Sequence, residues 1–548
     1  MRHMILKLNL VAILLLFGSF AKIDIINKGI IKNSEAVGIK ENHNRKLSDD
    51  GGGYMILYYN ENANYSSGFR NMYRKNIAYI INGNNITHID ENASFIVVPG
   101  EKVEIHFNNP PNELNSFFSV RQDNKVTNIM SIDLSNLDTS SVTNMDSMFS
   151  GCSSLRSINL SNFNTSSVTN MEKMFSACRY LRSIDLSNFN TSKVIKMNNM
   201  FGGCTSLESI DLSNFDTSKV INMDYMFYIC QNLKSIDLSK FNTSTVINMN
   251  SMFYQCQSLS SIDISNLILS KVIDMSNMFF QCIKLASINL SNINTSSVTN
   301  MTKMFSQCSV LKSLDLSNLD TSLVTNMEDM FSQCSSLESI NLSNLDTSSV
   351  INMNNMFYGC SSLRSINLSN FNISSVNTMY QMFSQCISLE SLDLSNFDTS
   401  KVIYMNNMFY GCSSLKSINL SNFDTSSVNT MYQMFSQCSS LESLNLSNFD
   451  ISLVTNMEDM FSQCSSLELL DLSNFNTSLV TNMNNIFNEC SSLKYIKLYR
   501  ITEGDYKLSS TYLNSINNLA VCQDKTILNN ANMKQLCCNY NIKIGICQ

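Results

Sequence analysis

The chain has no tryptophan, only three prolines and four histidines, and 15% charged residues among its 548. A net charge of −7 is small for this length and negative, which excludes the basic surface of nucleic-acid binders and of proteins that lie on anionic membranes. The histidines are His3, His43, His88 and His106. No nucleophile elbow, phosphate-binding glycine loop or metal-spaced His–Glu set occurs. We therefore predict a protein that is not an enzyme, with no catalytic residues, no metal site and no cofactor.

Cysteine, in contrast, is abundant and regular. Fourteen of the 18 cysteines stand 26 residues apart, from Cys152 to Cys490. A fixed period between 20 and 50 residues indicates a solenoid whose units bury their apolar faces against each other. We predict such a solenoid, of about 14 repeats, over residues 126–500. No two-repeat alternation suggests paired cysteines, so we expect the ladder to be a stack of buried thiols.

Each repeat contains two apolar patterns. The repeat that begins at Cys152 reads CSSLRSINLSNFNTSSVTNMEKMFSA. In its first part, Leu155, Ile158 and Leu160 follow the pattern of a short strand. In its last part, Met171, Met174, Phe175 and Cys178 are spaced i, i+3, i+4 and i+7, which predicts a short helix with one apolar stripe. The expected fold class is α/β, with a parallel strand and a short helix in each turn of the solenoid.

This repeat resembles that of the BspA-like leucine-rich-repeat surface proteins, and specifically the 26-residue type common in mycoplasma surface lipoproteins. The motif SLxSIDLSNFDTSxVTNMxxMFxxC carries the resemblance, over residues 126–500. The resemblance implies a leucine-rich-repeat-like solenoid in a surface-exposed or secreted binding protein, often one that adheres to host proteins or other cells. It implies no catalytic residues and no shared ligand. The lipid-anchor cysteine and cell-wall sorting signal of some relatives are absent.

The regions that flank the repeats differ from them in composition. Residues 1–21 read as a signal peptide with an apolar core, with an uncleaved anchor as the alternative. Residues 22–51 read as a polar linker or pro-segment, and no second apolar span follows. Residues 52–125 contain short aromatic and β-branched runs between turn residues, which predicts a small β-rich N-terminal domain. In a eukaryotic host, this domain would offer three glycosylation acceptors, Asn64, Asn85 and Asn92.

The C-terminal region, residues 501–548, holds the remaining cysteines. They are Cys522, Cys537, Cys538 and Cys547. An even number of cysteines in an exported chain predicts two disulfides in a C-terminal cap. The sequence leaves three pairings open, and a bond between the adjacent Cys537 and Cys538 is the least favoured of them.

Two rows of polar residues are candidates for a binding face. The variable row is the residue after the first leucine of each repeat, and it carries both charge signs: Arg156, Arg182, Glu208, Lys234, Lys312, Glu338, Arg364, Glu390, Lys416, Glu442 and Glu468. The Asp/Asn row lies three residues further on and includes Asp185, Asp211, Asp237, Asp315 and Asp393. Neighbouring strands should project both rows outward. A specific partner, a solvated face without a partner and, for stacked aspartates, calcium are the interpretations left open.

We expect a secreted, extracellular or cell-surface protein that binds without catalysis, in adhesion or host and cell interaction. Its partner would be a protein or a glycan on a cell surface or in a matrix, recognised on the exposed strand face. Nucleic acid is not an expected partner, and the mature chain should not span a membrane. The alternative is a structural coat or matrix protein that associates with itself. A third reading places an enzyme within residues 54–125.

Overall fold

The structure is a computed structural model that describes residues 52–59, 65–66, 77–82, 85–88, 96–97, 102–119, 129–497, 520–523 and 543–546. Its strands before the repeats are β1 (Tyr54–Tyr59), β2 (Tyr65–Ser66), β3 (Ile77–Asn82), β4 (Asn85–His88), β5 (Ile96–Val97) and β6 (Lys102–Phe107). The first strands of the repeat region are β7 (Ile129–Asp133), β8 (Ser157–Asn159), β9 (Ser261–Asp263), β10 (Ser287–Asn289), β11 (Ser313–Asp315) and β12 (Ser339–Asn341). They are followed by β13 (Ser391–Asp393), β14 (Ser417–Asn419), β15 (Ser443–Leu444), β16 (Leu469–Asp471), β17 (Tyr495–Lys497), β18 (Ala520–Gln523) and β19 (Lys543–Ile546).

The strands before the repeats continue directly into the solenoid. Strands β1, β3, β4 and β6 form one sheet with β7 and β8, in the order β4-β3-β6-β1-β7-β8, whereas β2 and β5 pair with each other in a separate sheet. Strand β1 is antiparallel to both β6 and β7, whereas β7 is parallel to β8. Leu57, Val103 and Ile105 are fully buried on one face of this sheet. The sheet therefore changes from antiparallel to parallel at β7, where the repeats begin.

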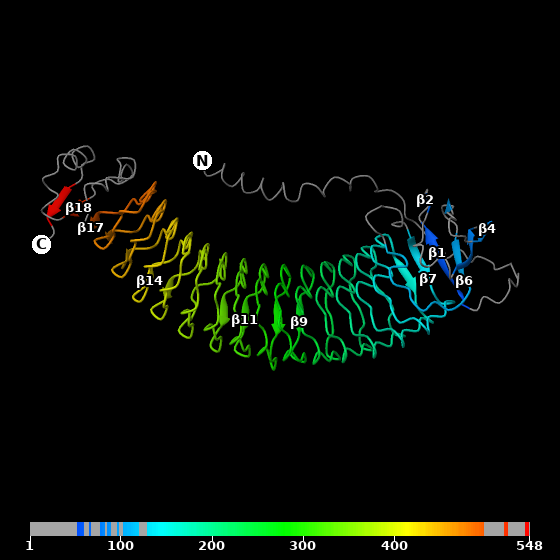
Figure 1. Cartoon of the computed structure of the whole chain (residues 1–548). Coiled ribbons are helices and arrows are strands. Elements are labelled where there is room, and N and C mark those ends of the chain that lie inside the picture. Colours follow the sequence, from blue (N-terminus) through cyan, green and yellow to red (C-terminus); the bar gives the residue numbers. More distant parts are fainter. Residues whose placement is uncertain are drawn as a thin grey trace. The chain divides into compact units, whose positions relative to one another are not determined.

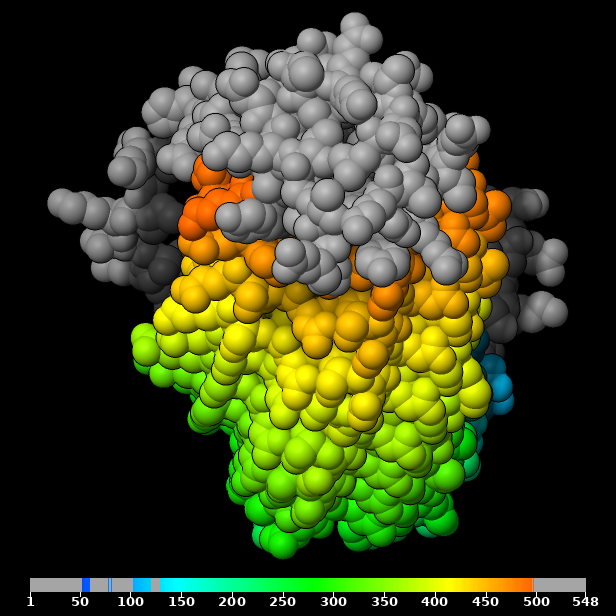
Figure 2. All heavy atoms as spheres, turned by 90° about the vertical axis from the view of Figure 1, so that its left-hand side faces the viewer, coloured from blue at the N-terminus to red at the C-terminus, as the bar shows by residue number. Residues whose placement is uncertain are grey.

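The repeat region is a solenoid, as the cysteine period predicts, and this β-solenoid has about 13 turns, close to the 14 repeats expected. Successive rungs follow one another in sequence order (Figure 1), and the space-filling view shows them as adjacent bands from orange through yellow to green (Figure 2). Each rung buries the same positions. In one rung these are Leu155, Leu160, Phe163 and Val168, followed by Met171, Met174, Phe175 and Cys178. Each rung is thus closed only by its neighbours, which is the property of a solenoid.

Hydrogen bonds between rungs are concentrated away from the predicted strands. The strands at the Ser-Ile-Asn positions are short, and several form only pairs, such as β9 with β10 and β11 with β12. A continuous row of parallel bridges instead runs from Asn144 through Asn170 and onward to Asn482, at the position before the first methionine of each MxxMF motif. This row, and not the strand face, connects every rung from 144 to 482.

The predicted helix is wrong. No residue of the described ranges is helical. In the stretch from Met171 to Cys178, the amide N–H groups of Lys173 and Phe175 donate to carbonyl oxygens of Asn198 and Met200 in the next rung, at 3.0 and 2.9 Å. An α-helix needs those same N–H groups for bonds to residue i−4 within the segment.

Consecutive turns replace the helix and produce the same apolar spacing. The amide of Met174 donates to the carbonyl of Met171 at 3.2 Å, and Cys178 to Phe175 at 3.2 Å. Two residues in each of these turn strings have positive φ, here Lys173 at 52° and Ala177 at 59°. Because each turn brings residues i and i+3 close together, the i, i+3, i+4, i+7 pattern arises without a helix.

Two side-chain ladders fill the core along the solenoid. The phenylalanine that precedes each cysteine by three residues stacks on its counterpart in the next rung, as in Phe279 on Phe305 with ring centroids 5.8 Å apart. A buried threonine forms the second ladder. Thr165 donates its hydroxyl to the carbonyl of Asn190 at 3.0 Å and accepts the amide N–H of that same residue at 2.8 Å. Both ladders bind a rung to its successor through buried groups.

Several predictions concern residues that the structure does not describe. The signal peptide, the linker, Asn64, Asn92, Cys537, Cys538 and Cys547 lie outside the described residues. Asn85 begins β4, and Cys522 lies in β18, the backbone of which pairs with β17 and β19. The glycosylation sites, the disulfides and the domain boundaries stay predictions. Within the described residues, no helix is long and apolar enough to cross a membrane.

Candidate binding surface

Where a rung has a short strand, the strand turns two polar side chains outward, and rungs without an assigned strand expose the same positions. In β8, Ser157 and Asn159 are exposed, while Ile158 between them is half-buried against the core. Leu155 and Leu160 on either side are buried. This alternation is the one expected of a strand that covers a core with one face. The Asp/Asn row is therefore exposed, as the sequence predicts, and it includes Asp185, Asp211, Asp237, Asp315 and Asp393.

Aspartate and asparagine pair with each other in the Asp/Asn row. The amide of Asn159 donates to the carboxylate of Asp133 at 3.0 Å, and Asn341 donates to Asp315 at 2.9 Å. The backbone amide of Ser317 also donates to Asp315, at 3.0 Å, and this bond lowers the pKa of that carboxyl. The asparagines therefore link neighbouring rungs and share the aspartate charge, which disfavours a calcium strip in those places.

The variable row is exposed along its length, with Glu208 half-buried. The structure brings its opposite charges together. Within the row, four ion pairs join neighbouring rungs: Lys234–Glu208 at 2.7 Å, Lys312–Glu338 at 3.4 Å, Lys416–Glu390 at 3.7 Å and Lys494–Glu468 at 2.9 Å. Lys494 extends the predicted row by one rung. The sequence signal for this pairing was present, because a lysine and a glutamate stand 26 residues apart in each of the four pairs.

Exposed pairs of this kind contribute little to stability, with a median of about 0–1 kcal/mol. Their effect is on the pattern of charge. From Lys312 to Glu442 the row presents alternating signs at the spacing of neighbouring rungs, and Glu468 repeats the negative sign before Lys494. Such a ladder is complementary to a partner with the opposite alternation and repels one with a displaced register.

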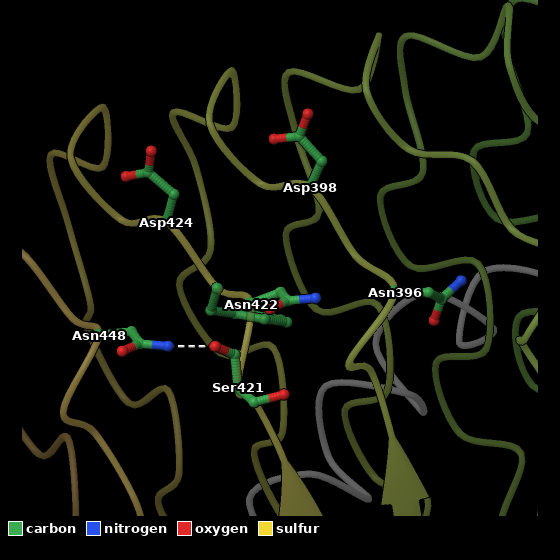
Figure 3. Close-up of a pocket in the computed structure, with 7 residues that line it drawn as sticks. Asn396, Asp398, Ser421, Asn422, Asp424 and Asn448 are labelled. Atoms are coloured by element: carbon green, nitrogen blue, oxygen red, sulfur yellow. Dashed lines mark hydrogen bonds between the residues drawn. The ribbon is translucent and has the colours of Figure 1, made fainter.

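A second open surface lies at the loop that follows the strand, and sequence reasoning did not identify it as a site. It is a shallow pocket of about 580 Å³, lined by Asn396, Asp398, Ser421, Asn422, Phe423, Asp424 and Asn448. Figure 3 shows Asp398 and Asp424 on neighbouring rungs, above Asn422 and Asn448. The repeated Phe-Asp-Thr-Ser motif at these rungs was the signal that could have identified it.

The aspartate and asparagine side chains of this pocket also form hydrogen bonds with the backbone. The carboxylate of Asp398 accepts the amide N–H of Ser400 at 3.1 Å, and that of Asp424 accepts Ser426 at 2.9 Å. The side-chain amide of Asn448 donates to the carbonyl of Ser421 in the preceding rung. Among the described residues, no group of three or more His, Cys, Asp and Glu is arranged to hold a metal ion.

The comparison with protein families finds one that matches most of the chain. Its model is described as "Mycoplasma protein of unknown function, DUF285". It matches overlapping stretches at residues 113–235, 177–287, 205–312, 260–341, 280–391, 333–439 and 415–503. Together these span 113–503, which is more than half of the 548 residues. The match confirms the resemblance of the repeat to the mycoplasma type. A comparison with curated proteins finds no match.

Several solved structures are similar in part. A leucine-rich-repeat protein from Bacteroides ovatus is 19% identical, with a TM-score of 0.37, over 82% of this chain and 98% of that one. One from Eubacterium ventriosum is 18% identical, with a TM-score of 0.30, over 64% and 84%. One from Leptospira interrogans is 16% identical, with a TM-score of 0.21, over 67% and 90%. We draw nothing about function from likenesses at these levels.

Proposed function

Because this chain belongs to the family described as Mycoplasma protein of unknown function, DUF285, we propose that it is a non-catalytic binding protein, secreted or exposed at a cell surface, that acts in adhesion or host and cell interaction. Its partner is a protein or a glycan. The observation that carries the proposal is the contrast between a constant core and the exposed variable row. Leu337 and Leu363 are buried at equivalent positions, whereas the residues that follow them are Glu338 and Arg364.

Such a contrast is how repeat proteins distinguish partners. The buried positions hold every rung in the same geometry, so a change in the variable row alters the surface without altering the scaffold. The charges that alternate from Lys312 to Glu442, including the ion pairs Lys312–Glu338 and Lys416–Glu390, supply a charge register on this scaffold. A partner recognises this register through complementary charges, which act mainly on specificity and association rate.

One observation favours the alternative, a structural coat that associates with itself. Ile195, Ile221, Ile247 and Ile273 occupy one position on four consecutive rungs and are 40%, 40%, 41% and 50% exposed. Their backbones form a ladder, in which the amide of Ile221 donates to the carbonyl of Ile195 at 3.0 Å. A contiguous exposed apolar stripe can serve association between copies of a protein.

The two functions are separated by one pair of variants. In E390K/K416E the ion pair and the net charge are retained, but the order of charges along the variable row is reversed at two rungs. In I221T/I247T the apolar stripe is interrupted by threonine, the residue that occupies the same position at Thr299 and Thr325. The original chain and both variants are immobilised, and capture from detergent-solubilised cell surfaces and matrix is compared.

Partner binding predicts that E390K/K416E loses capture while I221T/I247T retains it. A coat predicts that the original chain captures only itself, and that I221T/I247T sediments as a smaller species in analytical ultracentrifugation. Equal capture by the original chain and E390K/K416E would show that the partner does not recognise the order of charges in the variable row. Melting temperatures of the three proteins establish that the fold is unchanged.

A further inference from the structure

A row of aromatic side chains on the outside of the solenoid is interrupted by two serines. This outer aromatic row is the residue two places before each ladder cysteine. Over six consecutive rungs it reads Tyr228, Tyr254, Phe280, Ser306, Ser332 and Tyr358. The structure contains an open notch of about 320 Å³ where the serines stand. Neither the variable row nor the Asp/Asn row contributes to it.

The aromatic rings give the notch two apolar ends. Tyr228 stacks on Tyr254 with ring centroids 4.8 Å apart, and Tyr254 stacks on Phe280 at 4.7 Å. Because one face of Phe280 is covered by Tyr254, its other face is directed along the stack to the rung of Ser306. Tyr358 lines the notch three rungs beyond Phe280. At about 4.8 Å for each rung, the two aromatic residues are roughly 14 Å apart along the stack.

The floor of the notch is small and closed. Ser306 and Ser332 are 2% and 5% exposed, so they fill the position without projecting into the opening. Beside them, the ammonium group of Lys303 and the carboxylate of Asp329 lie 3.6 Å apart on neighbouring rungs. The opposite charges offset each other, so the notch has donors and acceptors but no excess of one charge.

Amide side chains complete the walls. A ladder of glutamine side chains runs along the solenoid to the notch, where Gln281 donates to the side-chain oxygen of Gln307 at 2.6 Å. Gln333 and Gln381 line the notch further on. Asn355 also lines it, and its side-chain oxygen is buried with no hydrogen-bond partner among the described residues. A buried acceptor without a partner costs free energy, and a ligand donor would satisfy it.

We propose that this notch binds a neutral saccharide, with one pyranose ring stacked on the open face of Phe280. A pyranose has apolar C–H groups on its faces and hydroxyl groups at its edge. The notch offers the complement, with an aromatic face at the end and amide, hydroxyl and ion-paired groups along the walls. An apolar surface with a small number of fixed polar groups is the usual composition of a small-molecule site.

The dimensions suit a sugar at the end of a glycan. The roughly 14 Å between Phe280 and Tyr358 exceeds the width of one pyranose ring, so the rest of a glycan can continue toward Tyr358. The opening keeps part of the ligand in water. An anionic ligand is disfavoured, because Asp329 offsets Lys303 and the chain as a whole is negative.

The outer aromatic row itself provides the test variants. In S306Y a tyrosine continues the stack from Phe280 and fills the notch, and tyrosine is the residue that the row already has at Tyr254 and Tyr358. The matched control is S436Y, which makes the same change next to Tyr410, outside the notch. In F280S the platform is replaced by the residue found at Ser306. The three variants are made in the full chain. In each of them, the new residue is one that the outer aromatic row already contains in another rung.

Binding is measured by saturation-transfer NMR with the methyl glycosides of glucose, galactose, mannose and N-acetylglucosamine. We expect at least one glycoside to bind the original chain and S436Y equally. We expect S306Y to abolish binding and F280S to weaken it about tenfold, equivalent to about 1.4 kcal/mol. Failure of all four glycosides to bind, or equal binding by S306Y, overturns the proposal. E390K/K416E should bind the glycoside as well as the original chain does. Sugar binding at the notch and partner capture by the variable row are therefore tested independently.

Discussion

The thiol of Cys178 donates a hydrogen bond to the backbone carbonyl of Phe149, in the preceding rung, with sulfur and oxygen 3.3 Å apart. Every later cysteine of the ladder makes the same contact, and Cys490 ends it with a bond to Phe461 at 3.0 Å. All fourteen ladder cysteines are buried with free thiols, which confirms the predicted stack. The thiols thus act as small apolar groups with one donor each, and they connect rungs without covalent bonds.

These thiols should be inert in the folded protein. Burial raises the pKa of Cys204 and of Cys282 to about 12, so almost no thiolate forms at neutral pH, and the thiolate is the species that reacts with alkylating reagents. We expect iodoacetamide to leave the ladder unmodified in native protein and to modify about fourteen cysteines after unfolding without reductant. Mass spectrometry of the ladder peptides measures both states. Rapid alkylation of native Cys204 would contradict the structure.

A glycine substitution distinguishes the turns from the predicted helix. Ala177 has φ of 59°, in the left-handed region, and Gly203 occupies the equivalent position one rung later. In a helix interior, alanine to glycine costs about 1 kcal/mol. At positive φ, glycine relieves a steric cost of roughly 1–2 kcal/mol, offset in part by the entropy of the unfolded chain.

We therefore expect A177G to leave the free energy of unfolding unchanged or to raise it by up to about 1 kcal/mol. The control is A286G, at an exposed position of the variable row outside these turns, which should destabilise the protein by roughly 0.5–1 kcal/mol. Urea titrations of both variants give the comparison. A loss in A177G as large as that in A286G would restore the helical interpretation.

The helix prediction failed because the apolar spacing on which it rested is also produced by consecutive turns. Met171, Met174, Phe175 and Cys178 have the spacing of a helical stripe, and Asn170 accepts the amide N–H of Glu172 as a helix N-cap would. Both signals are local, and a string of turns satisfies them equally. The choice is made by bonds between Lys173 and Asn198, 25 residues away, in the next rung. The repeat itself was predictable because its signal is the 26-residue period, which does not depend on local conformation.

For the binding surface, the sequence predicted that the variable row and the Asp/Asn row are exposed. It did not predict the ion pairs within the variable row or the notch at Ser306. The 26-residue spacing placed Lys234 beside Glu208, and the ion pair follows from that neighbourhood. The notch at Ser306 was not predicted, because serine in the outer aromatic row carries no signal by itself. It becomes a site only where Phe280 and Tyr358 stand on either side, a relation among four rungs. Asn355 could not be identified from the sequence, because only the structure shows that its side-chain oxygen is buried without a hydrogen-bond partner among the described residues.

The buried threonine ladder should contribute to stability through hydrogen bonds. Thr165 is fully buried and bonds both the carbonyl and the amide N–H of Asn190. In T165V the shape is kept, but two backbone groups lose their partner. We expect a loss of about 1–3 kcal/mol in the free energy of unfolding.

The control for T165V uses the equivalent position in another rung, where Ile373 is buried in place of threonine. In I373V one methylene is removed and no hydrogen bond changes, with an expected loss of about 0.5–1.5 kcal/mol. Urea midpoints of both variants are compared with the original. A loss in T165V no greater than that in I373V would show that solvent satisfies the backbone groups of Asn190.

The N-terminal sheet should give the protein an acid-sensitive step. In β6, the carboxylate of Glu104 lies 3.2 Å from the ring nitrogen of His106 and 2.7 Å from the ammonium group of Lys102. The hydrogen bond with His106, and then that with Lys102, lowers the pKa of Glu104 from its ordinary 4.5 to about 2. Because the folded-state pKa is the lower one, Glu104 stabilises the fold fully above about pH 4.5, and this contribution is lost as the pH falls toward 2.

We expect the melting temperature of the original chain to fall between pH 4.5 and 2 more steeply than that of E104Q, which has no carboxyl to protonate. The matched control is E442Q, which removes an exposed carboxylate of the variable row. It should follow the original chain across the same range. Differential scanning calorimetry in steps of pH measures the slopes. Equal slopes for the original chain and E104Q would show that the contacts with His106 and Lys102 do not favour the ionised carboxylate, because stability depends on pH only where folded and unfolded pKa values differ.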